Sequence, residues 1–140
     1  MFTLWMWNVI ERLPMRREAR ESAFKLIFET LFKDAEEETL NEVISPLKKE
    51  ADVKFCEDIF KLYEEHREEL EKEVSTHLQN YDVSRVYRID LALIYLALTE
   101  IKYLSTPKAV AINEAIEISK KYSTIDSKRF INGILSAILG

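Results

Sequence analysis

The sequence predicts an all-α fold, and three observations carry that prediction. Eight apolar residues follow one another without a break from Leu91 to Leu98. A helix that is apolar on every side must be covered on every side, and this run is far too short to span a bilayer. Only two Gly and three Pro occur, which leaves little turn chemistry for a β protein. Hydrophobic residues make up 47% and charged residues 32%, so a sizeable core and a hydrated surface are both expected.

We predict that the apolar run is the centre of a buried helix from about Ser84 to Leu104, with Ser84 as its N-cap. A buried strand is the competing interpretation, and the length of the segment argues against it. The first turn of this helix carries Arg85 and Arg88, and Asp90 lies at the edge of the apolar run. A single carboxylate there is either paired with an arginine such as Arg88 or offered to a partner.

The segment Met1–Pro14 differs from the rest of the chain because it holds a cluster of large apolar and aromatic side chains. It lacks the basic region and the small-residue cleavage site of a signal peptide. Either translation truly begins at Met15 and the segment comes from a misplaced start, or it is a short apolar arm that docks on the domain. We therefore divide the chain into an extension, residues 1–14, and one helical domain, residues 15–140.

The first helix of the domain is predicted from Met15 to Phe32, with apolar residues at helical spacing. Arg16, Arg17 and Arg20 would lie in its first turn. Cations there face the positive end of the helix dipole, which costs a few tenths of a kcal/mol each. The cluster is either a solvated charged turn or a site for an anionic partner.

Three shorter helices are predicted before the central one. The first would begin in a capping box at Thr39, the second would start near Asp52, and the third would follow a charged bend, residues 64–69. His66 and His77 have no companion ligands nearby in the sequence, so we interpret them as surface or packing residues. Cys56 is interpreted as a small core residue.

Two helices are predicted after the central one. The first would be capped by Thr106 with Pro107 at its first position, and the last would be capped by Asp126 or Ser127. Gly133 falls in the middle of the last helix, where glycine costs about 1 kcal/mol relative to alanine. We take this as a sign that another helix approaches closely.

Charge is distributed unevenly along the chain. The formal net charge is −5, but residues 84–140 carry +3 and the preceding residues −8. An acidic protein can still bind RNA through a local basic surface, because phosphate contacts act within about a Debye length. A single cysteine excludes an internal disulfide and, with no signal peptide, predicts a cytoplasmic protein.

Three segments resemble the sequence signatures of the NusB family of bacterial transcription antitermination factors. Val110–Glu117 and Asp126–Leu135 are similar to the C-terminal signature, and Arg16–Ala23 is similar to the N-terminal arginine motif. The resemblance extends from Met15 to Leu139. It implies a bundle of seven helices in two packed subdomains.

The resemblance also implies a function. NusB-like proteins bind the boxA segment of ribosomal RNA leader transcripts together with NusE, a small-subunit ribosomal protein. The complex helps RNA polymerase to resist premature termination. We therefore expect single-stranded boxA-type RNA, NusE and the antitermination complex of RNA polymerase as partners, and no membrane.

Matching the motifs residue by residue gives two expected sites. The partner site for NusE would include Phe28, where some relatives have Tyr, and Asp90, where Glu is common. The RNA site would include Arg16, Arg17, Arg20, Asp126, Ser127, Arg129 and Phe130.

Independently of the family resemblance, the chemistry of these residues is suited to binding RNA. Arginine binds phosphate through two parallel hydrogen bonds, and single-stranded bases stack on aromatic rings. Phe130 is either such a platform or a core residue. A helix N-terminus near Ser127 offers backbone N–H groups to an anion. Asp126 would repel phosphate, so it should accept hydrogen bonds from bases or cap the helix.

The sequence leaves two alternative functions. A NusB-like module acting only through proteins, for example as a homodimer, predicts no loss of function when the arginines are removed. An enzyme is the third interpretation, because the fold also occurs beside RNA cytosine methyltransferase domains. The chain has no Gly-rich cofactor loop, no catalytic Cys in a basic context and no metal-binding motif. We therefore predict no enzyme activity, no catalytic residues, no metal and no cofactor.

Overall fold

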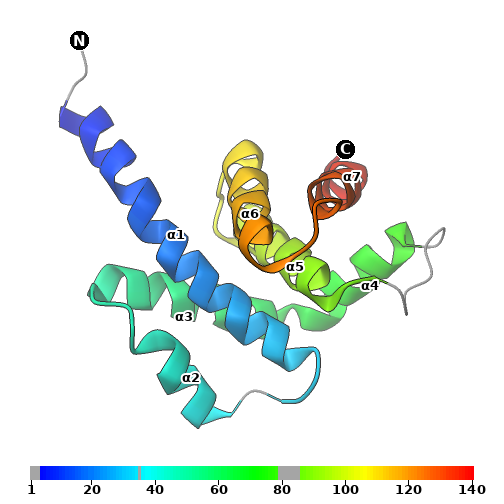
Figure 1. The fold of residues 1–140 in the computed structure, drawn as a ribbon, viewed down its shortest axis with the longest axis horizontal. Coiled ribbons are helices and arrows are strands. Elements are labelled where there is room, and N and C mark those ends of the chain that lie inside the picture. Colours follow the sequence, from blue (N-terminus) through cyan, green and yellow to red (C-terminus); the bar gives the residue numbers. More distant parts are fainter. Residues whose placement is uncertain (1–3, 35, 79–85) are drawn as a thin grey trace.

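The computed structural model is a helical bundle, as the sequence predicted (Figure 1), and it describes residues 4–34, 36–78 and 86–140, with side chains from residue 16 onward. No strand occurs in these ranges. Nor does any helix there combine the length and the hydropathy that crossing a membrane requires. The helices are α1 (Leu4–Thr30), α2 (Glu37–Ile44), α3 (Glu50–Glu65), α4 (Arg67–His77), α5 (Arg88–Tyr103), α6 (Lys108–Tyr122) and α7 (Ser127–Leu139).

Two groups of helices meet where α1 packs on α5 (Figure 1). On one side α1 contacts α2 and α3, and on the other α5 contacts α6 and α7. Every residue of α5 from Ala92 to Glu100 is buried. This confirms the prediction that the uninterrupted apolar run forms a helix covered on all sides.

Helix α5 begins at Arg88 and not at Ser84, so its predicted start was wrong. Tyr87 is extended (φ −63°, ψ 129°), and its carbonyl accepts the first helical hydrogen bond from the Leu91 amide at 3.1 Å. Val86 is apolar and continues the hydrophobic pattern although it lies before the helix, which is why periodicity placed the boundary too early. Ser84, the predicted cap, and Arg85 lie outside the described residues.

Helix α1 was also predicted with the wrong start, because it continues through Pro14 to Leu4. Proline lacks an amide hydrogen, but its fixed φ near −65° is compatible with helical backbone, so Pro14 does not have to end the helix. The three arginines therefore lie in the interior of a 27-residue helix and not in its first turn. The predicted penalty from the helix dipole does not apply, since that effect is confined to the terminal turns.

Two predicted threonine caps were wrong for the same physical reason. The hydroxyl of Thr39 donates to the carboxylate of Glu29 at 3.2 Å, and the hydroxyl of Thr106 donates to the carboxylate of Glu100 at 3.3 Å. Each threonine therefore bonds to another helix and not to its own first turn. Helix α2 begins at Glu37, before Thr39, and α6 begins directly after Pro107.

The remaining predictions for the middle of the chain agree more closely with the structure. Helix α3 begins at Glu50, close to the predicted start near Asp52, and His66 separates α3 from α4 as the charged bend predicted. The His66 ring stacks on Tyr103, with 3.9 Å between ring centroids. Cys56 is fully buried, and burial raises the pKa of its thiol to about 12. Its interpretation as a core residue is confirmed.

Gly133 does not mark a close approach of helices, so that prediction was wrong. A Cβ atom built at this position would meet no atom within 4 Å, and the residue is exposed on α7. Replacing Gly133 with alanine should therefore raise the free energy of unfolding by about 1 kcal/mol, because alanine has the higher helix propensity. A thermal melt checks this, and an unchanged or lower melting temperature would contradict it.

Candidate nucleic-acid interface

The three arginines of α1 contact different parts of the molecule. Arg16 places its guanidinium carbon 4.4 Å from the centre of the Phe55 ring on α3. Arg17 turns toward α6, where it meets Glu114. Arg20 contacts two helices. Its guanidinium carbon lies 5.3 Å from the centre of the same Phe55 ring, and its Nε donates to Glu100 of α5. The arginine motif thus joins α1 to three other helices.

Arg20 is buried, which sets it apart from its two neighbours. Its side chain is 3% exposed and that of Glu100 is 1% exposed, and Nε lies 2.9 Å from both carboxylate oxygens of Glu100. Burial raises the pKa of Glu100, against the opposing effect of Arg20. The predicted direct contact of Arg20 with RNA does not fit this placement, because bound RNA cannot reach a side chain that is 3% exposed.

Arg17 is half exposed and is held by a carboxylate at its inner edge. Its Nε and Nη2 atoms donate to the two oxygens of Glu114 at 2.8 and 2.9 Å. The hydrogen bond to Glu114 is the main reason that the pKa of Arg17 is raised. Arg17 can therefore offer its outer edge to an anion while it remains attached to α6.

The start of α7 contributes both exposed and buried groups. Asp126 and Arg129 are exposed, whereas Phe130 is partly buried and packs against the core. Ser127 is 1% exposed, and its Oγ accepts a hydrogen bond from the Thr124 amide at 3.2 Å. Asp126 occupies the N-cap position of α7 but makes no capping hydrogen bond with its side chain. Ser127 thus orders the turn before α7 and is not a surface residue.

Asp90 is buried beneath the same turn and does not form an exposed acidic site. Its carboxylate accepts a hydrogen bond from the Ser123 hydroxyl at 2.6 Å, and Ser123 lies 2.6 Å from the Ser127 hydroxyl. The alternative pairing with Arg88 is absent among the described residues, since Arg88 lies over the Phe32 ring. Asp90 was expected to face a partner directly. In the structure it is buried and stabilises the α6–α7 turn through its hydrogen bond with Ser123.

Charges on α1 and at the start of α7 both act on Glu117 of α6. Lys120 donates to the Glu117 carboxylate at 2.7 Å and is the main cause of its lowered pKa. The positive charges of Arg17 and Lys128 lower the pKa of Glu117 further. The charges of cations on α1, α6 and α7 therefore all act on one carboxylate, on a chain whose net charge is −5.

Three lysines that sequence reasoning missed belong to this region. Lys120 and Lys128 line a groove of about 370 Å³ between α6 and α7, together with the 95% exposed Ile125. Lys121 donates to Glu21 of α1 at 3.0 Å. The signal that could have revealed these lysines is the net positive charge of residues 84–140. We refer to Arg17, Lys120, Lys121 and Lys128, with the exposed Arg129 that follows Lys128 in the chain, as the basic surface.

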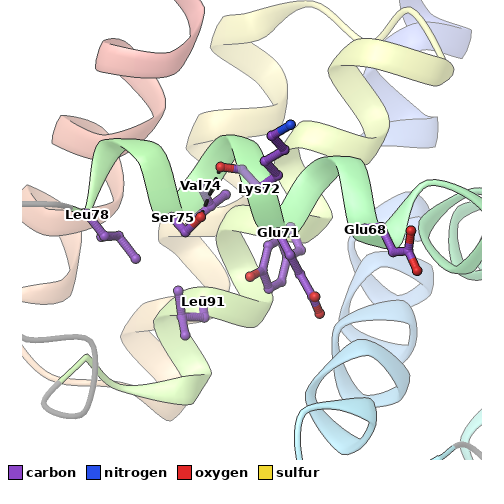
Figure 2. Close-up of a pocket in the computed structure, with 8 residues that line it drawn as sticks. Glu68, Glu71, Lys72, Val74, Ser75, Leu78 and Leu91 are labelled. Atoms are coloured by element: carbon purple, nitrogen blue, oxygen red, sulfur yellow. Dashed lines mark hydrogen bonds between the residues drawn. The ribbon is translucent and has the colours of Figure 1, made fainter.

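A second groove, between α4 and α5, has different chemistry (Figure 2). It has a volume of about 570 Å³, with Val74, Leu78 and Leu91 among its apolar lining residues. The Glu68 and Glu71 carboxylates line the same groove, and Lys72 is the one cation among its described lining residues. Two acids against one cation repel phosphate, so this groove is not a candidate for nucleic acid.

An exposed aromatic area lies at the C-terminal end of α1, near the start of α5. Phe28 is partly buried and contacts Phe32 edge-on, with 5.0 Å between ring centroids. The ring of Phe32 is 60% exposed, and the Arg88 guanidinium lies 5.0 Å from its centre. Phe28 and Phe32 thus form an apolar surface with a cation beside it.

Comparisons of sequence identify relatives over most of the chain. A model of the NusB family matches residues 17–139. The transcription antitermination protein NusB of Thermoanaerobacter sp. (strain X514) is 36% identical over 128 residues, covering 89% of this chain and 89% of the relative. The protein of the same name from Clostridium botulinum (strain Kyoto / Type A2) is 33% identical over 144 residues, covering 89% and 99%.

Comparisons of structure agree with the sequence match. T. maritima NusB superposes with a TM-score of 0.79 at 28% identity, covering 88% of this chain and 89% of that chain. A chain from the crystal structure of antitermination factors NusB and NusE in complex with dsRNA has a TM-score of 0.79 at 22% identity, covering 89% and 96%, and shares the fold. This protein therefore belongs to the NusB family of transcription antitermination proteins.

Proposed function

We propose that this transcription antitermination factor binds boxA-type single-stranded RNA of ribosomal RNA leader transcripts, together with NusE, as part of the antitermination complex of RNA polymerase. Its relatives from Thermoanaerobacter and Clostridium botulinum are named transcription antitermination proteins. The observation that carries the proposal is the basic surface: Arg17 on α1 is half exposed, Lys120 and Lys128 line one groove between α6 and α7, and Lys121 donates to Glu21 of α1. A structural relative with the same fold was crystallised with NusE and dsRNA, which supports the choice of partners.

In this proposal, phosphates bind the exposed cations. Arg17 and Arg129 serve as donors on α1 and α7, and Lys120, Lys121 and Lys128 contribute charge between them. Arg16 extends the surface toward α3. Arginine binds phosphate oxygens in pairs, whereas lysine acts as a point charge, so the arginines fix the orientation of the strand.

Bases are read by the turn before α7 and by its first residues. The exposed part of Phe130 stacks on a base, and the exposed carboxylate of Asp126 accepts hydrogen bonds from base amino groups. Ser127 and Asp90 are buried and do not touch RNA. They hold the turn in place through hydrogen bonds to the Ser123 hydroxyl. Arg20 has the corresponding role on α1, because its ion pair with Glu100 fixes that helix against α5.

NusE would bind beside the aromatic area at the end of α1. Phe28 and Phe32 provide an apolar contact, and Arg88 supplies a charge at its rim. Asp90 lies in the first turn of α5, two residues after Arg88, and bonds to Ser123 of the α6–α7 turn. A partner that rests on these elements should strengthen RNA binding by ordering the same turn.

A titration of labelled boxA-type RNA, with and without NusE, tests the proposal. The chain should bind boxA-type RNA in preference to a scrambled strand, and NusE should tighten that binding. The Phe32→Ser variant should bind RNA alone normally but lose the effect of NusE, because Phe32 is exposed just after the C-terminal end of α1 and is not part of the basic surface. Equal binding of both RNAs, with no effect of NusE, would contradict the proposal and favour a module that acts through proteins, for example as a homodimer.

A further inference from the structure

We propose that Glu114 of α6 is a positioning residue, which holds the guanidinium of Arg17 so that its outer edge faces the phosphates of bound RNA. The inference rests on the proposed function, because it concerns the same basic surface. It assigns to an acidic side chain a favourable effect on the binding of an anion, which is the opposite of what its charge alone would predict.

The geometry of the pair leaves Arg17 available for a ligand. A guanidinium carries five N–H groups in a rigid fork. Glu114 accepts from Nε and Nη2 at 2.8 and 2.9 Å, so the Nη1 hydrogens and one Nη2 hydrogen remain. The Arg17 side chain is 49% exposed and that of Glu114 is 10% exposed. The carboxylate thus occupies the buried edge of the guanidinium and leaves the outer edge accessible to solvent.

Both members of the pair are attached to fixed backbone. Arg20, which follows Arg17 by three residues on α1, forms a buried ion pair with Glu100 of α5. Glu114 itself is buried, and its neighbour Ala115 belongs to the core. An arginine confined in this way loses less side-chain entropy when it binds phosphate than one that moves freely in solvent. The pair therefore preorganises the contact.

Two substitutions on the same helix separate positioning from charge. Glu114→Gln removes one negative charge from the basic surface and also disrupts the paired hydrogen bonds to Arg17, because an amide offers one acceptor oxygen. Glu117→Gln removes the same charge one turn further along α6, where the carboxylate bonds to Lys120 and not to Arg17. Simple electrostatics predicts that both variants bind RNA more tightly.

The positioning role predicts opposite results for the two variants in a titration of boxA-type RNA with NusE present. Glu117→Gln should tighten binding, whereas Glu114→Gln should weaken it roughly two- to tenfold, the range expected for one released side chain. Combining Glu114→Gln with Arg17→Ala should give no further loss beyond Arg17→Ala alone. Melting curves accompany each variant, and Glu114→Asp, which keeps the charge but shortens the side chain, should weaken binding in the same direction.

Tighter binding by the Glu114→Gln variant, equal to that of Glu117→Gln, would overturn the inference while leaving the proposed function intact. Unchanged binding by Glu114→Asp would overturn it as well, and that variant decides the question if Glu114→Gln does not fold. Absence of RNA binding by the unsubstituted protein would instead reject the proposed function itself.

Discussion

Replacing Arg20 with alanine is expected to lower the free energy of unfolding by about 3–5 kcal/mol, because it leaves the Glu100 carboxylate buried without its partner. Both side chains are almost fully buried in the structure, and Nε of Arg20 contacts both carboxylate oxygens. The Thr106 hydroxyl, which also donates to Glu100, cannot replace a cation. Denaturant unfolding at pH 7 measures the effect.

The same variant should show a characteristic dependence on pH. Burial already raises the pKa of Glu100 in the folded protein, and the loss of Arg20 removes the effect that opposes burial. The folded-state pKa therefore rises further above the unfolded value. A protonated Glu100 is then favoured in the folded state, so the destabilisation should shrink as the pH falls below the folded pKa and be largest above it.

Two controls accompany this measurement. Lys54→Ala breaks an exposed ion pair with Asp58, which solvent screens, so it should change stability far less than Arg20→Ala. The double variant Arg20→Met/Glu100→Leu should recover much of the loss, because it removes both buried charges. A loss for Arg20→Ala as small as that for Lys54→Ala, with no dependence on pH, would contradict the assigned role of Arg20.

Replacing Arg16 and Arg17 together with alanine is expected to weaken binding of boxA-type RNA at least tenfold, because the loss of even one charged hydrogen bond of about 1.5–3 kcal/mol corresponds to that factor. The dependence of affinity on salt should also decrease, by about 0.7 in the slope of log K against log[salt] for each phosphate contact removed from a single strand. Fluorescence anisotropy at several salt concentrations measures both quantities.

The matched control removes the same number of positive charges, two, from other helices. Lys61 and Lys72 are exposed on α3 and α4, and neither lines the groove that Lys120 and Lys128 line. Lys61→Ala/Lys72→Ala should therefore leave the salt slope nearly unchanged. If both double variants lowered affinity equally, net charge and not the arginine motif would account for the binding.

The sequence was most informative where one interaction dominates. The run from Leu91 to Leu98 could only be a covered helix, and the structure buries nearly all of it. Helix boundaries were less predictable, because they depend on what each cap residue finds in space. Thr39 and Thr106 fit the local rules for caps, but carboxylates on other helices were better partners for their hydroxyls.

The candidate site shows the same limit. Sequence patterns could identify Arg16, Arg17 and Arg20 as a motif, but spacing along one helix does not tell which arginine meets a buried acid. Glu114 and Glu100 come from helices far along the chain, and their pairing with α1 depends on tertiary packing. The burial of Asp90 against the α6–α7 turn could not be predicted from the sequence for the same reason.

One measurement tests most directly whether α1 and the start of α7 form a single surface for RNA. In an NMR titration with one short boxA-type strand, backbone amides of residues 16–20 and 126–130 should shift together, with a common midpoint and a one-to-one stoichiometry. Shifts confined to one of the two segments, or separate midpoints for each, would show that no single strand spans them and would contradict the account.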